Sequence, residues 1–115
     1  MMKSIAGKLL VLALCSLVSV TAAVAGGDMG WRKIQSISQR TCAPSKGLEV
    51  TLTTAHNNPD FCPNSDTVEI ACGLAIYKQM LAMVLTAQSA DLEIRGFVDG
   101  CDADGQAQLQ SMRLR

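Results

Sequence analysis

One stretch of this sequence has the periodicity of an amphipathic helix, whereas the other patterned segments alternate like β-strands. The stretch spans residues 73–90 and reads GLAIYKQMLAMVLTAQSA. Apolar residues recur in it every three or four positions and form one broad face: Ile76, Tyr77, Met80, Leu81, Met83, Val84 and Ala87. Because strand-like runs flank it on both sides, we expect a mainly β fold with one helix between two groups of strands.

Five strands are expected around this helix. The clearest begins at Leu48 and ends at Thr54, where apolar and polar residues alternate as in a half-buried strand. The other four are expected at 31–40, 67–72, 91–98 and 107–115. Ile34 and Ile37 are three positions apart and cannot both face one side of a regular strand, so either the first strand bends or bulges between them or this segment is not a strand. A second bulge is expected near Gln110, where the alternation changes phase.

Polar and turn-forming segments separate the strands. Residues 26–30 (GGDMG) are expected to be a flexible lead-in, and residues 41–47 a turn. Residues 55–66 form a long polar loop with two prolines. The segment 99–105 (DGCDADG) resembles a calcium loop only faintly, because the positions that require carboxylates hold Gly100 and Ser111. A tight turn between two strands is the better interpretation.

The first 25 residues have the features of an export signal. Lys3 and Lys8 precede an apolar run over residues 9–20, and the small residues Ala23 and Ala25 suit a cleavage site. The run is shorter than the ~20 residues of a membrane span. We therefore expect a signal peptide at 1–25, a single domain at 26–115, secretion or periplasmic localisation, and no stable membrane insertion.

Four cysteines remain after this segment: Cys42, Cys62, Cys72 and Cys101. An even number in a short exported chain predicts two disulfides. A zinc site is the rival interpretation, but no pair has the CxxC spacing and His56 is the only histidine. A catalytic thiol pair is disfavoured for the same lack of CxxC.

The order of elements, β-β-β-α-β-β, is that of the OB-fold, a small Greek-key barrel. Other α+β folds allow the same order. We expect a five-stranded OB-like Greek-key barrel of the mainly β (α+β) class, with one central helix. Sequence alone permits three disulfide pairings. The barrel places the start of its second strand near the end of its third, and so favours Cys42–Cys72 and Cys62–Cys101.

Charge and motifs exclude several functions. Without residues 1–25 the chain has 8 Lys and Arg against 10 Asp and Glu, a net charge of about −2. This argues against a nucleic-acid partner, which favours a basic surface. His56 lies in a polar loop and is expected to be solvated, and packing is the default expectation for Trp31 and Phe61. No catalytic, cofactor-binding or metal-ligating residue is predicted, and the chain is not expected to be an enzyme.

The outer face of the predicted helix has unusually few charged residues. It contains one charge and several small residues: Ala75, Lys78, Gln79, Ala82, Thr86 and Ser89. A helix that is apolar or neutral on nearly all sides is usually buried against other protein surfaces. We therefore hypothesise that the protein self-associates through this face; a bland solvent-exposed helix is the alternative.

A resemblance follows from Cys62 after the second strand, Cys72 at the end of the third, the helix YKQMLAMVLTAQ and the pair Gly100-Cys101. The layout of residues 31–115 resembles the OB-fold B subunits of pentameric bacterial toxins of the subtilase-cytotoxin type. It also resembles small exported proteins of Gram-negative bacteria. The toxin resemblance implies a ring whose helices line a central pore and whose outer surface binds host glycans. Those subunits pair the cysteines of strands two and three directly, so Cys42 and Cys101 indicate a different framework, and no glycan-contact residue carries over.

The expected function is an exported, non-enzymatic binding module, a self-associating subunit for a glycan or protein ligand. The alternative is a monomeric periplasmic structural or envelope protein, and a small hydrolase or inhibitor is a third possibility.

Overall fold

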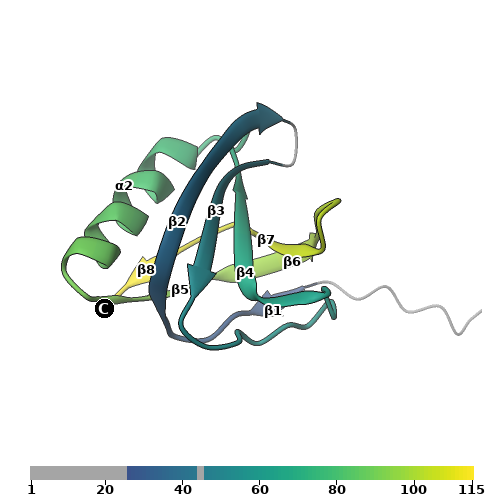
Figure 1. Cartoon of the computed structure of the whole chain (residues 1–115), viewed down its shortest axis with the longest axis horizontal. Coiled ribbons are helices and arrows are strands. Elements are labelled where there is room, and N and C mark those ends of the chain that lie inside the picture. Colours follow the sequence, from purple (N-terminus) through teal and green to yellow (C-terminus); the bar gives the residue numbers. More distant parts are fainter. Residues whose placement is uncertain (1–25, 44–45) are drawn as a thin grey trace, which may run out of the picture.

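The computed structural model describes residues 26–43 and 46–115, and the predicted signal peptide lies outside them. This part of the chain forms eight strands and one helix (Figure 1). The strands are β1 (Gly27–Asp28), β2 (Arg32–Ala43), β3 (Lys46–Leu52), β4 (Asn64–Ala71), β5 (Glu93–Arg95), β6 (Phe97–Cys101), β7 (Gln106–Leu109) and β8 (Arg113–Leu114). The helix is α2 (Tyr77–Ser89). The class is therefore mainly β with one helix, as the sequence predicts.

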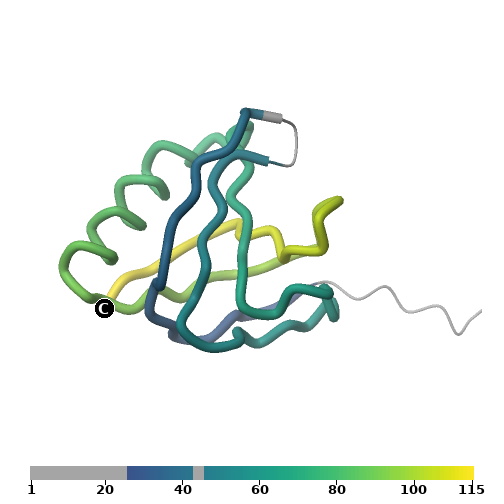
Figure 2. Tube along the Cα trace, viewed as in Figure 1, coloured from purple at the N-terminus to yellow at the C-terminus, as the bar shows by residue number. Residues whose placement is uncertain are grey.

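All eight strands belong to one sheet, in the order β1-β6-β7-β4-β3-β2-β5-β8. Every pair is antiparallel except β4 and β7, which run parallel. The expected number of five strands is wrong, because the described residues form eight, and the sheet does not close into a barrel but has β1 and β8 at its ends. Figure 2 shows how the chain curves through this sheet and ends beside the last turn of the helix.

The extra strands arise because two predicted strands are interrupted. Gly96 separates β5 from β6, and residues 110–112 separate β7 from β8. At Gly96 the backbone approaches so closely that an added Cβ would lie 1.8 Å from the carbonyl oxygen of Ser111. Only glycine fits this crossing. The predicted irregularity in the first strand is confirmed, since the register of β2 on β3 shifts between Ile34 and Ser36.

The lead-in is also ordered, contrary to expectation. Residues Gly27 and Asp28 pair with Val98 and Phe97 of β6, and Met29 is fully buried. The Met29 N–H donates to the Gly96 carbonyl at 2.9 Å. A short glycine-rich segment has no alternation of apolar and polar residues, so its sequence does not predict a strand. Its strand structure depends on pairing with β6.

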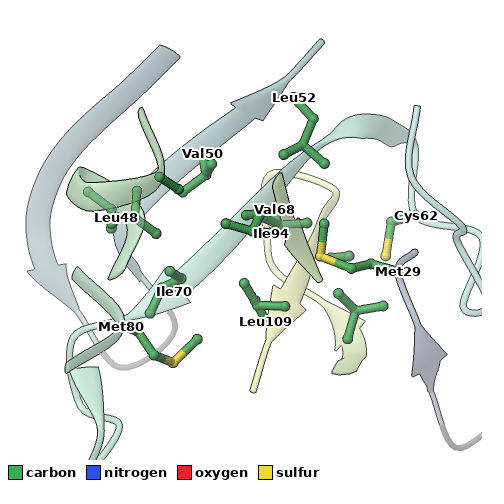
Figure 3. Close-up of a cluster of buried hydrophobic side chains, with 14 residues drawn as sticks. Met29, Leu48, Val50, Leu52, Cys62, Val68, Ile70, Met80, Ile94 and Leu109 are labelled. Atoms are coloured by element: carbon green, nitrogen blue, oxygen red, sulfur yellow. The ribbon is translucent and has the colours of Figure 1, made fainter. Parts of the chain in front are cut away.

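The core lies between the sheet and the helix (Figure 3). Its buried side chains come from β3, β4, α2, β5, β6 and β7, and each fully buried Val, Leu, Ile or Met among them contributes roughly 1.5–3 kcal/mol. They include Leu48, Val50, Leu52, Val68, Ile70, Met80, Val84, Ala87, Ile94, Val98, Ala107 and Leu109. The predicted alternation in β3 is confirmed by the first three of these residues.

The helix begins later than predicted. Residues 73–76 form tight turns, in which Tyr77 N–H donates to the Leu74 carbonyl at 3.0 Å, and the regular helix starts only at Tyr77. Met80, Val84 and Ala87 of the predicted apolar face are buried, as expected. Ile76 lies outside the helix and is 41% exposed, which corrects its place on that face. No helix in the described part of the chain is both long and apolar enough to cross a membrane.

Two disulfides fasten the sheet. They join Cys42 to Cys72 and Cys62 to Cys101, the two pairs favoured from the strand order, each with a Cα–Cα distance of 5.6 Å. The first connects the ends of β2 and β4, and the second connects the 55–63 loop to the end of β6. With sequence separations of 30 and 39 residues, each bridge stabilises by about 4 kcal/mol in the chain-entropy description.

Candidate functional site

Most residues singled out in the sequence have structural roles. His56 is not solvated as expected: it is 4% exposed, and its Nδ1 lies 2.7 Å from the Asn57 carbonyl oxygen. The turn predicted at 99–105 is shorter in the structure, because residues 99–101 belong to β6 and only residues 102–105 form the turn. Asp102 Oδ1 accepts the backbone N–H groups of Asp104 and Gln106 there, at 2.9 Å each. Within residues 26–43 and 46–115, no cluster of three or more His, Cys, Asp or Glu side chains could hold a metal ion.

The six residues of the predicted oligomer face, Ala75, Lys78, Gln79, Ala82, Thr86 and Ser89, are all exposed. Two hydroxyl groups on this face bond back to the helix itself. Thr86 Oγ1 donates to the Ala82 carbonyl and Ser89 Oγ to the Leu85 carbonyl, both at 2.9 Å. The face therefore offers few free hydrogen-bonding groups, and no other element of residues 26–43 and 46–115 covers it.

A network of charged side chains covers the other side of the sheet, away from the core, and no sequence pattern indicated it. Arg40 of β2 contacts the carboxylates of Glu49, Glu69 and Asp104 at 2.8, 3.7 and 2.8 Å. Lys46 Nζ lies 2.9 Å from the same Asp104 oxygen. Hydrogen bonds from Lys46 and Arg40 lower the pKa of Asp104. The network ties β2, β3 and β4 to the turn between β6 and β7.

Glu69 is the buried centre of this network. Its side chain is fully buried, and burial raises its pKa to about 7, with the negative charges of Asp102 and Glu49 adding to the effect. The Gly47 N–H donates to Glu69 Oε2 at 3.0 Å and, with Arg40, acts in the opposite direction. Three buried oxygens here lack a hydrogen-bond partner: Glu69 Oε1, Asp102 Oδ2 and Gln106 Oε1. A proton on Glu69 would supply a hydrogen-bond donor among these acceptors.

A cleft lies where the two interrupted strands cross. Its volume is about 260 Å³, and it is lined by Asp28, Arg95, Gly96, Phe97, Ser111, Met112 and Arg113. Because β5 pairs with β8, Arg95 and Arg113 are direct cross-strand neighbours. Like charges directly opposite each other destabilise a sheet. Arg95 is compensated by Asp28, whose Oδ2 it contacts at 2.6 Å.

Arg113 forms no direct ion pair with another residue of the described ranges. Its charge does act on Asp28, whose pKa is lowered by the Gly30 N–H, by Arg95 and by Arg113, so the two arginines share one carboxylate. A positive charge at the wall of a cleft, beside a second arginine, is suited to an anionic group of a ligand. Phe97 is 41% exposed and adds an apolar surface.

Trp31 adjoins this cleft beneath three guanidinium groups. The Cζ atoms of Arg115, Arg95 and Arg113 lie 4.4, 5.8 and 6.0 Å from its ring centroid. Cation–π attraction holds arginines over an aromatic face. Trp31 is therefore a platform that orients the arginines, and its face is not free for stacking on a sugar ring.

Phe61 is the most exposed large apolar side chain in the described residues, at 85%. The default expectation that it packs is wrong. Its φ of +53° is in the left-handed region, which is uncommon for residues other than glycine and asparagine.

Comparison of the chain with protein-family models, with curated proteins and with solved structures gave no match.

Proposed function

We propose that the protein is an exported, non-enzymatic binding subunit whose cleft takes an apolar side chain and a neighbouring carboxylate from a protein ligand. The cleft between Arg95, Phe97 and Arg113 carries this proposal, because it joins two arginines that share a single carboxylate, Asp28, to an exposed aromatic surface. A dry cavity of roughly 150 Å³ already accepts benzene. A volume of about 260 Å³ thus suits one phenyl or large aliphatic group with an acidic neighbour.

A protein ligand is favoured over a glycan by the state of the aromatic residues. Sugar rings stack on open aromatic faces, but Arg115 lies 4.4 Å above the centroid of Trp31. Phe97 is the only other aromatic residue at the cleft among the described residues. Binding of a glycan would have to displace the arginine from Trp31, whereas a carboxylate would be attracted by it.

An opened OB-like arrangement is the finer description that we propose for the fold. It is supported by the pairing of β5 with β2 and of β6 with β7, because β5 and β6 are the two halves of one predicted strand. The parallel pairing of β4 with β7 accords with it as well. Two disulfides accord with the proposed secretion or periplasmic localisation.

The proposal is tested by titrating the isotopically labelled protein with N-acetyl-aspartyl-phenylalanine amide. The full chain is exported by the expression host before purification. We expect amide chemical-shift changes at Gly96, Phe97 and Ser111, and their loss in Arg113→Gln, which removes only the positive charge. N-acetyl-asparaginyl-alanine amide is the matched control peptide and should cause no such changes.

Two results would contradict the proposal. One is the absence of shift changes at the cleft with the acidic aromatic peptide. The other is selective binding on a glycan array that persists in Arg113→Gln. Absence of peptide binding together with absence of any glycan signal would favour the alternative of a structural or envelope protein.

A further inference from the structure

Phe61 is held in solvent by a loop that is fastened on both sides. Asn58 Oδ1 accepts the Cys62 N–H at 2.9 Å, and Asn58 Nδ2 donates to the Cys62 carbonyl at 2.7 Å. The Phe61 N–H donates to the Asn58 carbonyl at 3.0 Å. Asp60 Oδ2 accepts the Gly100 N–H at 2.7 Å, and the disulfide of the buried Cys62 with Cys101 closes the loop. The position of Phe61 is therefore fixed by its neighbours.

This presentation is unfavourable in the isolated molecule for two separate reasons. A left-handed backbone is strained for phenylalanine, and an 85% exposed phenyl ring leaves its apolar surface in water. Strained residues that the surroundings fix in this way concentrate at functional sites. Rigid exposed aromatic side chains are the usual anchors of protein interfaces.

The surroundings of Phe61 are acidic. Asp60 belongs to the same loop, and Asp99 lies at the adjoining end of β6. Neither carboxylate forms an ion pair with another described residue. The segments 54–71 and 96–112 contain no lysine or arginine at all. The loop therefore presents a phenyl ring beside unpaired negative charge.

These properties are complementary to the cleft on the same chain. The cleft offers Arg113, which has no direct ion pair in the described residues and shares the charge of Asp28 with Arg95. It also offers the apolar surfaces of Phe97 and Met112 and enough volume for a phenyl ring. Phe61 does not line this cleft, so one molecule carries both an exposed anchor and a separate acceptor. An anchor and an acceptor at different places on one surface form a head-to-tail contact between copies.

We propose that the cleft binds the Phe61 loop of a second copy of this chain, with Phe61 in the cleft and Asp60 or Asp99 facing Arg113. This inference rests on the proposed function, because it names the occupant of the same cleft. Repetition of the contact produces a closed ring or an open chain of subunits. The helix face at Ala82 takes no part in it.

The test measures self-association of the exported full chain by sedimentation velocity over a concentration series. Phe61→Asn removes the ring and places a residue that tolerates the left-handed backbone, so its melting temperature should be unchanged or higher. Arg113→Glu reverses the charge of the acceptor. We expect the wild-type protein to assemble and each variant to weaken assembly by roughly 30-fold or more, the factor that corresponds to loss of an interface anchor.

Mixing the two variants distinguishes a head-to-tail contact from any symmetrical one. Phe61→Asn retains an intact cleft, and Arg113→Glu retains an intact loop. An equimolar mixture therefore has one functional pair, and it should form dimers that cannot grow further. Ala82→Glu on α2 is the surface control and should assemble like the wild type.

The inference is overturned by a wild-type protein that stays monomeric, by a Phe61→Asn variant that assembles normally, or by a mixture that remains monomeric. Loss of assembly in Ala82→Glu alone would assign the interface to the helix instead. The peptide titration distinguishes failure of the self-association proposal from failure of the proposed binding function. Peptide binding at the cleft without self-association refutes only the second copy as occupant, whereas failure of both refutes the binding function too.

Discussion

Substitution of Glu69 by glutamine should stabilise the protein at neutral and alkaline pH. Burial raises the pKa of Glu69 from 4.5 to about 7 in the folded protein. Each unit of difference corresponds to 1.36 kcal/mol, so ionising this carboxyl opposes folding by up to about 3 kcal/mol. The pKa of about 7 already includes the attraction between Glu69 and Arg40, which by itself lowers the pKa.

The sign follows from which state binds the proton more tightly. Below pH 4.5 the carboxyl is protonated in both the folded and unfolded chains, and Glu69 causes no loss of stability. Between 4.5 and about 7 the unfolded chain ionises while the folded one does not. The contribution of Glu69 to the free energy of unfolding therefore falls through this range, and it stays low above pH 7. Glutamine cannot ionise, and its amide can donate to the unpartnered oxygens of Asp102 or Gln106.

The assay is urea unfolding of the wild type and Glu69→Gln at intervals from about pH 4 to about pH 9, where the difference in unfolding free energy isolates this group. We expect a difference near zero at the acid end, rising to about 3 kcal/mol in favour of the variant at the alkaline end. Asp102→Asn removes a nearby negative charge and should move the midpoint of the change to lower pH. A difference that does not vary with pH would refute a buried carboxyl with a raised pKa. A Glu69→Gln variant that is less stable than the wild type at every pH would contradict the proposed hydrogen bond from its amide to the unpartnered oxygens of Asp102 or Gln106.

Three further predictions concern the framework of the fold. Arg40→Gln should lower the free energy of unfolding, because Glu49, Glu69 and Asp104 lose the cation that they share. The loss should be largest above pH 7, where these carboxylates are ionised, and urea unfolding at two pH values checks it. Gly96→Ala should cost about 3 kcal/mol or more, since the added methyl has no space at the strand crossing; circular dichroism on heating would show it. Replacing Cys62 and Cys101 together by serine should cost about 4 kcal/mol in urea unfolding. An unchanged stability of any variant would contradict the role given to it.

Features whose causes are local were predictable from the sequence. The alternation from Leu48 to Leu52 requires only that one face of a strand be buried, and all three apolar residues are buried. The spacing of Ile34 and Ile37 likewise required an irregularity, which the register of β2 shows. The expected strand order favoured the two disulfide pairs that the structure contains, because it brought the segments carrying each pair of cysteines to the same end of the sheet.

Features that depend on distant partners were not predictable. Glu69 reads as the polar face of an ordinary strand, but Arg40 and the turn containing Asp104, 64 positions from Arg40, cover it. Met29 lies in a glycine-rich segment without periodicity, and its burial depends on β6, nearly 70 residues later. His56 looked solvated because its neighbours are polar, although the chain folds over it. For Glu69 and Met29 the deciding contact is far away in sequence and carries no local pattern.

The net charge of the chain does not reveal how its charged residues are distributed, and this distribution bears on function. A total of about −2 for residues 26–115 suggests no strong electrostatic preference. The structure separates the charges instead: Arg95, Arg113 and Arg115 gather around Trp31, whereas the loop that presents Phe61 has only acidic neighbours in its own and the adjoining segment. Opposite charges at different places attract copies of the chain in one orientation and oppose contacts between like places. The composition that argued against a polyanionic partner is therefore compatible with a locally basic cleft whose natural complement is on the same molecule.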